Sequence, residues 1–460
     1  MQPFRFWRRS LETNAFGAAL VLALGCGATD STKSPADGQN ELAERDPAEL
    51  YDWDHVPTFE LSLPPGEFEH LLATAADEVY TRASLTFDQK PIGDVGLRFK
   101  GSVGTLESCF DAQGNLTCPK LSMKLGFDEY VPSTRFFRQK RLNLHSMVRD
   151  DTKLHERLAY DLYRSMGIVA PRSAWAVVKV NGESLGLFSM VEQIDGRFTA
   201  NRWPGAGDGN LYKEAWPLST DAQYYEDHLE TGASQPDAAP HSAYVDFTSA
   251  LSAGGDDKGR GALGRYMDLE YLSRYMAVDD AILNVDGVTA TYTGDDPRYY
   301  ANHNFYVYQE EQRGFFWLVP WDMDATFNLR GDFELVPRWN GSGADCTSRY
   351  TVWGAARVVS PACDHLFQAL ASDPSSYQAA VDELLAGDFS EAKLNETIDR
   401  HAAFIASAVE HDPKGAGLSA WQGAVSYLKR QLPLVRAHLG RAKLGLSSKP
   451  LMLAAESVTD

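Results

Sequence analysis

Basic residues are scarce in this chain: 43 Lys and Arg stand against 63 Asp and Glu, and the formal net charge at pH 7 is −20. Binding to nucleic acid or to an anionic membrane surface relies on an excess of Lys and Arg, so neither is expected to be a main partner. The 460 residues are 44% hydrophobic, which is enough for a sizeable core in one bilobal unit or in two or three domains.

Long apolar runs are also lacking. Residues 16–24 form a short apolar stretch behind three arginines, too short for an ordinary membrane span and typical of a bacterial secretion signal. Residues 22–26 (LALGC) resemble a lipobox, although the position before Gly25 is usually smaller than Leu. We therefore expect a signal peptide over 1–26, lipid on Cys26 and a flexible polar tether over 27–54. Cleavage nearby without lipidation is the alternative.

This reading makes the protein an exported bacterial lipoprotein of the cell envelope or cell surface. It would be held to the membrane by its N-terminal lipid alone. We expect a monomer.

Cysteines are few, with five in the chain. If Cys26 carries lipid, the other four fall into two local pairs, and outside the cytoplasm such pairs favour disulfides. We predict Cys109–Cys118 and Cys346–Cys363. A four-cysteine zinc site is the rival, but neither pair has the tight C-x2-C spacing of such sites.

The first half of the chain is predicted to be a strand-rich lobe over 55–204. Residues 95–102 and 121–127 alternate between apolar and polar side chains, as half-buried strands do. Residues 150–167 have leucines at a spacing of four and end on a glycine, which predicts a helix. Two apolar runs flank Asn181-Gly182, a strong hairpin signal.

The second half is predicted to be mainly helical. Gly, Asp, Ser and Pro dominate 205–262, which predicts a surface insertion with one short helix. A helical lobe follows over 263–445, interrupted by a strand hairpin at 303–309 and 315–322, before a tail at 446–460. The fold class is therefore α+β, in the bilobal layout of a kinase, although other α+β enzymes share it.

Two acids close the second strand of that hairpin, Asp322 and Asp324. Asn304 opens the partner strand, and Asp286 follows an apolar helix upstream. An Asp that accepts or orients a nucleophile's proton, with an Asn and an Asp that hold metal on phosphates, is the set that phosphoryl transfer needs. Asp322, Asp324 and Asn304 are therefore the predicted metal ligands. Asp322 and Asp324 could instead cap a turn and pair with Arg330 or Arg338, and Asp286 could be a turn residue at a helix end.

Partners for the phosphates are sought in the strand-rich lobe. Gly101 and Ser102 lie in a turn that could cover phosphates, and Lys120 and Lys124 share one strand face. Either lysine could bind phosphate, and Glu156 on the following helix could tether it. The alternatives are a plain turn, solvated lysines and a surface acid. His145 and His303 are interpreted as structural.

The catalytic-loop and Asp-Phe-Gly signatures of ordinary protein kinases are absent as written. An ordered series of motifs instead resembles the spore-coat protein H (CotH) kinase family of atypical secreted kinases over about 55–445. Its segments are 98–102, 120–124, 180–186, 191–195, 209–213, 284–286, 303–308 and 320–324.

The resemblance implies a kinase-like fold that binds ATP with Mg2+ or Mn2+ and phosphorylates Ser or Thr of a protein substrate. Asp286 would be the catalytic carboxylate, Asp322 a metal ligand with Asn304 a second, and Glu192 would lie near the adenine hinge. Gly287 and His155 stand where the family often has Arg.

Two other classes of function remain open. One is a non-catalytic surface or structural binding protein that keeps the kinase-like fold. The other is a metal-dependent hydrolase that uses the same acids.

Overall fold

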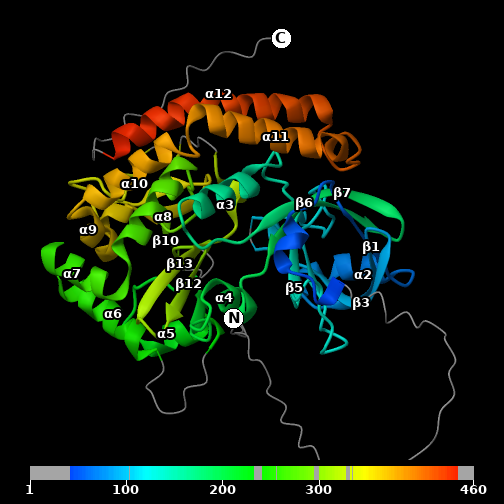
Figure 1. Ribbon diagram of the computed structural model, residues 1–460, viewed down its shortest axis with the longest axis horizontal. Helices are drawn as coiled ribbons and strands as arrows, with labels where there is room; N and C mark the ends of the chain where they lie inside the picture. Colours follow the sequence, from blue (N-terminus) through cyan, green and yellow to red (C-terminus); the bar gives the residue numbers. More distant parts are fainter. Residues whose placement is uncertain are drawn as a thin grey trace, which may run out of the picture.

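The computed structural model describes residues 42–102, 104–232, 241–254, 256–294, 300–327, 332–333 and 335–443. The predicted signal peptide, the lipidation of Cys26, residues 27–41 of the tether and the tail at 446–460 lie outside the described residues. The α+β class is confirmed: a barrel of strands lies beside a mainly helical part (Figure 1). We call these the barrel lobe and the helical lobe.

The barrel lobe is a closed barrel in the order β1-β2-β3-β4-β5-β7-β6. Its interior is apolar, with Phe59, Leu97, Leu125 and Leu142 fully buried. The short helix α2 (Glu67–Ala73) lies in the connection between the first two strands. The strands are β1 (Thr58–Ser62), β2 (Thr81–Phe87), β3 (Lys90–Phe99), β4 (Met123–Gly126), β5 (Arg141–His145), β6 (Ser173–Val180) and β7 (Glu183–Glu192).

The predicted hairpin and helix of this lobe are both present. β6 and β7 meet at Asn181-Gly182, where φ is 50° and 83°, as a tight hairpin turn requires. The helix, α3 (His155–Ser165), begins five positions later than predicted. Asp150 accepts hydrogen bonds from the backbone N–H of Thr152 and His155, both at 2.8 Å, and so holds the preceding residues in a turn.

The helical lobe is built around a four-stranded sheet in the order β13-β12-β8-β9. The predicted hairpin is β12 (Phe305–Glu310) with β13 (Phe315–Pro320), and β9 is Leu229–Thr231. The helices are α4 (Gly196–Arg202), α5 (Ala222–Asp227), α6 (Ser242–Ala253), α7 (Asp256–Tyr266), α8 (Leu269–Ala281), α9 (His365–Ala371), α10 (Ser375–Ala386), α11 (Glu391–Glu410) and α12 (Leu418–Ala442).

The predicted surface insertion at 205–262 is wrong. This segment contains β8 (Asn210–Lys213), which pairs with β12 inside the sheet, together with three helices. Leu211 and Tyr212 are buried in the core of the helical lobe. A strand of four residues is too short to produce a periodic signal against a Gly- and Asp-rich background.

The predicted tether is too long at its C-terminal end. Leu42 and Leu50 are buried against the barrel core, and the Phe137 N–H donates to the Leu42 carbonyl at 2.8 Å. Residues 42–54 are therefore part of the folded lobe.

A smaller sheet lies beside Asp286 in the order β11-β10-β15-β14. Its strands are β10 (Thr291–Thr293), β11 (Tyr300–Ala301), β14 (Tyr350–Val352) and β15 (Ala356–Val359). The disulfide Cys346–Cys363 encloses the β14–β15 hairpin, and Cys109–Cys118 closes the loop after β3. The structure thus contains both disulfides expected from the sequence.

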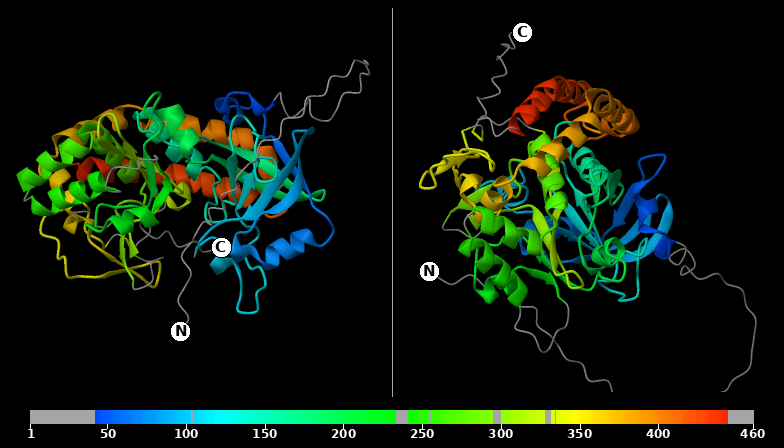
Figure 2. Two further views of the ribbon diagram at one scale, coloured as in Figure 1. Left: turned by 90° about the horizontal axis from the view of Figure 1, so that it is seen from below. Right: turned by 60° about the vertical axis from the view of Figure 1, so that its left-hand side comes forward.

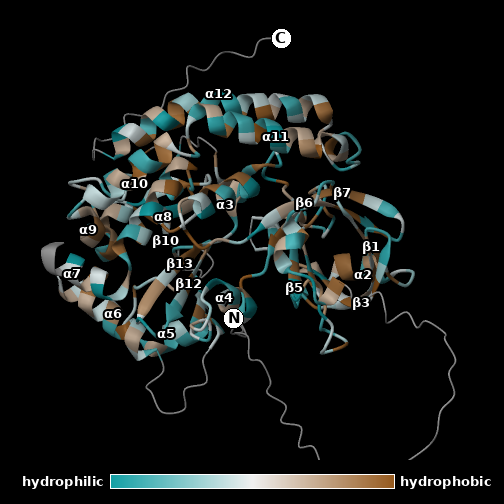
Figure 3. Cartoon of the chain, in the orientation of Figure 1, coloured by the Kyte–Doolittle hydropathy of each residue, from teal (hydrophilic) through white to brown (hydrophobic). Residues whose placement is uncertain are grey.

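Helices α11 and α12 form a hairpin that lies across both lobes (Figures 1 and 2). Hydrophobic and hydrophilic residues alternate along them (Figure 3), and residues such as Trp421 and Leu432 are buried beneath. The His401 ring lies 5.3 Å from that of Trp175 in the barrel. None of the described helices is both long and apolar enough to cross a membrane.

Candidate functional site

The ends of three neighbouring strands share an unusual backbone conformation. Glu214 follows β8, Asn304 precedes β12 and Asp322 follows β13, with φ of 57°, 61° and 56°. The left-handed region is costly for residues other than glycine, and such strain gathers at functional sites. The strained residues are all polar and lie at one edge of the sheet, which makes this edge the candidate site.

Asp286 and Asn304 meet at this edge. The Asn304 side-chain amide donates to the Asp286 carbonyl at 2.8 Å and to Asp286 Oδ2 at 3.1 Å. The Tyr292 hydroxyl donates to Asp286 Oδ1 at 2.5 Å. Burial raises the pKa of Asp286 to about 6, although the Tyr292 hydrogen bond acts to lower it. A half-buried carboxylate held from two sides is suited to accept a proton near neutral pH.

Asp322 and Asp324 stand at the beginning of the turn after β13. The Asp322 N–H donates to the Tyr160 hydroxyl at 3.1 Å, and His155 Nδ1 lies 3.1 Å from the Asp324 carbonyl. Burial, and then the charge of Asp322, raise the pKa of Asp324 well above its usual range. The turn is thus anchored on α3, and Asp324 keeps its proton more readily than a solvent-exposed aspartate does.

The barrel presents Lys100 to these acids. Lys100 follows β3, and its Nζ lies 2.8 Å from His145 Nε2 and 5.4 Å from the centre of the Trp321 ring. Burial lowers the pKa of Lys100, while the charge of Asp322 acts most strongly to raise it. His145 Nδ1 lies 2.9 Å from Glu156 Oε1. Glu156 therefore reaches a lysine through a histidine, and that lysine is neither of the two predicted from the sequence.

Three of these side chains could hold a metal ion. His145, Glu156 and Asp322 each offer one ligand atom, and these atoms lie within 4.8 Å of one another. The second oxygen of Glu156, Oε2, is buried and has no hydrogen-bond partner among the described residues. An orphaned carboxylate oxygen beside a second carboxylate fits the oxygen ligands that Mg2+ and Mn2+ prefer. The metal role predicted for Asp322 remains a prediction, now with named neighbours.

Two further lysines border the site. Burial, and then the charges of Lys100 and Arg98, lower the pKa of Lys124 to about 7. Lys213, at the end of β8, has its pKa raised by Glu214. Neighbouring lysines that lower one another's pKa form a place where an anion would be favoured.

Lys120 does not belong to this group, which corrects one of the predicted phosphate ligands. Its ammonium forms an ion pair with Asp412 Oδ2 at 3.0 Å and donates to the Leu187 carbonyl at 2.5 Å. Asp412 lies in the loop between α11 and α12, so Lys120 fastens that loop to the barrel. Strand alternation placed Lys120 and Lys124 on one face but could not show which part of that face a distant loop covers.

The turn at Gly101 and Ser102 is held by backbone hydrogen bonds and close packing within the loop. Gly101 has φ of 146°, and a Cβ there would lie 2.9 Å from Thr105 Oγ1, so this position requires glycine. The Ser102 carbonyl accepts N–H groups from Thr105, Leu106 and Glu107, and its side chain is exposed. A phosphate-covering role for this turn stays a prediction.

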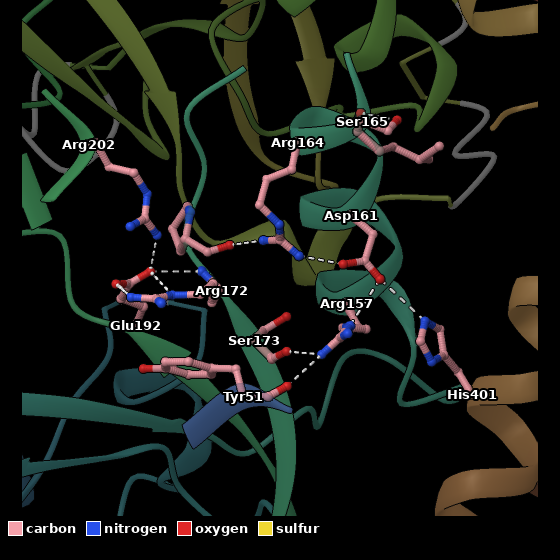
Figure 4. A network of polar contacts seen from close by, with 12 residues as sticks. Tyr51, Arg157, Asp161, Arg164, Ser165, Arg172, Ser173, Glu192, Arg202 and His401 are labelled. Atoms are coloured by element: carbon pink, nitrogen blue, oxygen red, sulfur yellow. Dashed lines mark hydrogen bonds and ion pairs between the residues drawn. The ribbon is translucent and has the colours of Figure 1, made fainter. Parts of the chain in front are cut away.

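Glu192 is at the end of β7, where the chain passes from the barrel to α4, as expected for a hinge. Its carboxylate forms ion pairs with Arg172 and Arg202 (Figure 4). Arg202 belongs to α4 and Glu192 to the barrel, so this contact joins the lobes. The Glu192 carboxylate is occupied by arginines, and its backbone N–H donates to the Arg172 carbonyl at 2.9 Å. A role of Glu192 near the adenine hinge stays a prediction.

Packing requires a glycine at position 287, directly after the candidate catalytic acid. A Cβ there would lie 2.2 Å from Asn284 Nδ2, which donates to Asp279 at 2.7 Å. A larger residue at 287 would displace this buried pair. The departure from the family pattern at this position therefore has a local structural cause.

Sequence reasoning missed His145 and Lys100 as members of the site. All of β5 from Leu142 to His145 is buried, because one face lines the barrel and the other faces the helical lobe. The missed signal was the pair Asn143 and His145, two polar residues with the same strand orientation. Such a face needs a polar partner when it is buried.

Comparison with known proteins agrees with the motif series. The family model described as CotH kinase protein matches residues 97–432. The inner spore coat protein H of Bacillus subtilis is 21% identical over 284 residues, which cover 59% of this chain and 69% of that protein. The invasin CotH7 of Rhizopus delemar is 25% identical over 304 residues, covering 62% of this chain and 46% of that protein.

Among solved structures, a complex of Shewanella oneidensis HipA and HipB with operator DNA has a similar chain. The TM-score is 0.29 at 12% identity, over 84% of this chain and 80% of the other.

Proposed function

The chain belongs to the CotH kinase family, and from this premise we propose that it transfers the γ-phosphoryl group of ATP to a Ser or Thr hydroxyl of a protein substrate. A divalent cation, Mg2+ or Mn2+, would serve with ATP between the two lobes of a kinase-like fold. The observation that carries the proposal is the meeting of Asp286 with Asn304 at the strand edge that also presents Asp322.

The acidic and the basic residues of the site would have different roles in the reaction. Asp322 and the free Oε2 of Glu156 would hold the cation, which supplies charge neutralisation to the phosphates when bound. Lys100 and Lys124 would contact phosphate oxygens from the barrel side. Asp286, fixed by Tyr292 and Asn304, would accept the proton of the attacking hydroxyl. Catalysis by such a site is positioning and electrostatic stabilisation.

Asn304 would act mainly by orienting Asp286, because its amide nitrogen is committed there. Its remaining oxygen keeps the predicted role of a second metal ligand open. Asp324 would keep its predicted role as a metal ligand, because a cation would offset the charges of the neighbouring acids that, after burial, raise its pKa.

We further propose that the protein works outside the cytoplasm, anchored by lipid on Cys26. Two disulfides in the described residues are what an exported protein contains. The names of the relatives, a spore coat protein and an invasin, support a surface location.

The test uses residues 27–460 incubated with γ-labelled ATP, Mg2+ or Mn2+ and a generic protein substrate. We expect label on protein Ser or Thr, and its loss in Asp286→Asn and in Asp322→Asn. Asp399→Asn is the matched control, because Asp399 is an exposed acid paired with Lys429. Labelled inorganic phosphate without labelled protein would instead support the hydrolase.

A non-catalytic kinase-like binding protein is the second candidate. Gly287, where the family often has Arg, favours it, since the arginine is missing beside the proposed catalytic acid. Ligand binding that needs no nucleotide and persists in both Asp variants would establish this alternative.

A further inference from the structure

Lys100, His145 and Glu156 form a chain of polar side chains that runs from a half-buried lysine to a buried glutamate. Lys100 Nζ lies 2.8 Å from His145 Nε2, and His145 Nδ1 lies 2.9 Å from Glu156 Oε1. His145 is 6% exposed and Glu156 is 3% exposed. The three residues come from the end of β3, the end of β5 and the first turn of α3, so the chain ties two strands to a helix.

With Lys100 as an ammonium and Glu156 as a carboxylate, the inventory of donors and acceptors allows one arrangement of protons in this chain. A lysine ammonium only donates, so His145 Nε2 must accept from Lys100. A glutamate carboxylate only accepts, so His145 Nδ1 must carry hydrogen and donate to Glu156. In this arrangement the imidazole carries its hydrogen on Nδ1, and both of its nitrogens are engaged.

Trp321 holds the same two side chains from the helical lobe. Its ring lies 5.5 Å from that of His145 at an interplanar angle of 84°, and the Lys100 ammonium lies over it. Trp321 directly precedes Asp322 in the chain. The position of Lys100 relative to Asp322 is thus fixed through His145 on one side and through Trp321 on the other.

We propose that His145 is a positioning residue that carries the anchoring effect of Glu156 to Lys100, where a direct lysine–glutamate ion pair would otherwise stand. This inference rests on the proposed function only in taking Lys100 to be a phosphate-binding lysine. It also assigns the cation: because both His145 nitrogens are occupied, the ion is held by Asp322 and Glu156 Oε2 without histidine.

The first test needs no catalysis. In residues 27–460 labelled with 15N-histidine, the imidazole signals of His145 are identified by their loss in His145→Gln and measured at pH 7.5. We expect a proton on Nδ1 and an acceptor-type Nε2, both unchanged when Mg2+ is added. A proton on Nε2, or a change of tautomer with Mg2+, would overturn the proposal.

The second test measures KM for ATP and kcat separately. We expect His145→Leu to lower kcat/KM by about 10-fold, mainly through KM, because it releases Lys100. Glu156→Gln should lower it further, because it also removes a proposed ligand of the cation. The double variant should be no worse than Glu156→Gln alone, since both changes break the same chain. Two independent, multiplying losses would contradict a relay.

Two further variants separate positioning from general damage to the fold. His145→Gln keeps a donor and an acceptor and should retain more activity than His145→Leu at the same melting temperature. His401→Leu is the matched control, because His401 is also 6% exposed and pairs with Asp161 at 3.3 Å, away from Lys100. We expect it to leave KM for ATP unchanged. If the wild-type protein transfers no phosphate, the kinase proposal fails while the tautomer measurement still decides the relay.

Discussion

The two faces of the candidate site are built in opposite ways. The barrel face supplies cations from regular strands, where Arg98, Lys124 and Asn143 lie side by side across β3, β4 and β5. The helical-lobe face supplies acids and an amide from strand ends, where Asp322 and Asn304 have left-handed backbones. Arg98 and Lys124 stand on regular strands, whereas Glu214, Asn304 and Asp322 stand on strained turns.

This difference has a physical reason. A lysine has a long side chain and reaches an anion from ordinary strand geometry. A carboxylate that holds a cation or accepts a proton must be placed within a fraction of an ångström. Because the side chains of Asp and Asn are short, their position is set mainly by the backbone. The backbone strain is therefore on the face that would handle the proton and the ion.

Removing the charge of Asp322 is expected to have the largest effect on the site. Asp322→Asn leaves the barrel cations without their opposing charge and takes away the proposed metal ligand. We expect phosphoryl transfer to fall about 1000-fold, the size of loss seen when one electrostatic contact to a transition state is deleted. Labelled transfer at saturating Mn2+ measures it. A loss below about 10-fold would remove Asp322 from the site.

Lys120→Met should separate a structural lysine from a functional one. Lys120 and Asp412 are 4% and 3% exposed, and breaking a buried pair costs about 3 kcal/mol in the free energy of unfolding because one charge stays buried alone. KM for ATP should not change. Urea unfolding and steady-state kinetics give the two values, and Lys429→Met, in an exposed pair, is the control.

Lys100→Met is the counterpart in the site. We expect kcat/KM to fall about 100-fold, which corresponds to about 2.7 kcal/mol of transition-state stabilisation, with a smaller effect on stability than Lys120→Met. ATP with Mg2+ should no longer raise the melting temperature, since ligand binding to the folded state is what stabilises it. If Lys124→Met has the larger effect, the roles of the two lysines must be exchanged.

Tyr292→Phe should give the smallest and most specific change. Burial raises the pKa of Asp286 to about 6, and the Tyr292 hydrogen bond opposes that rise. Activity needs the ionised carboxylate, so the rate should fall as the pH drops through about 6. Without the hydroxyl the pKa rises, and the acid limb moves to higher pH by roughly one unit or less. The pH profile of kcat/KM measures the shift, with Tyr300→Phe, on exposed β11, as the control.

Much of this arrangement was predictable because strands and hairpins leave local signals. Alternation and Asn181-Gly182 located the β6–β7 hairpin, and the polar residues at the ends of β12 and β13 located the acidic edge. The meeting of Asp286 with Asn304 was predicted from the chemistry of the two residues and not from strand pairing, because Asp286 follows α8 and belongs to no strand of that sheet.

The rest depended on contacts that no local pattern contains. Lys120 is paired with a residue 292 positions away, and only that loop distinguishes it from Lys124. β8 has four residues, too few for a period, yet it lies within the sheet. Both faces of β5 are buried near His145, so burial does not alternate along this strand. The usual guide to which residues face the site is therefore missing there.

The α11–α12 hairpin limits how the lobes can move. The chain connects them at the β7–α4 crossing, and the Lys120–Asp412 pair fastens them a second time. The contact of His401 with Trp175 adds to this attachment, so opening the lobes on the side of the hairpin would leave a buried charge unpaired. If the protein binds a nucleotide as proposed, we expect the nucleotide to enter and leave at the edge away from the hairpin.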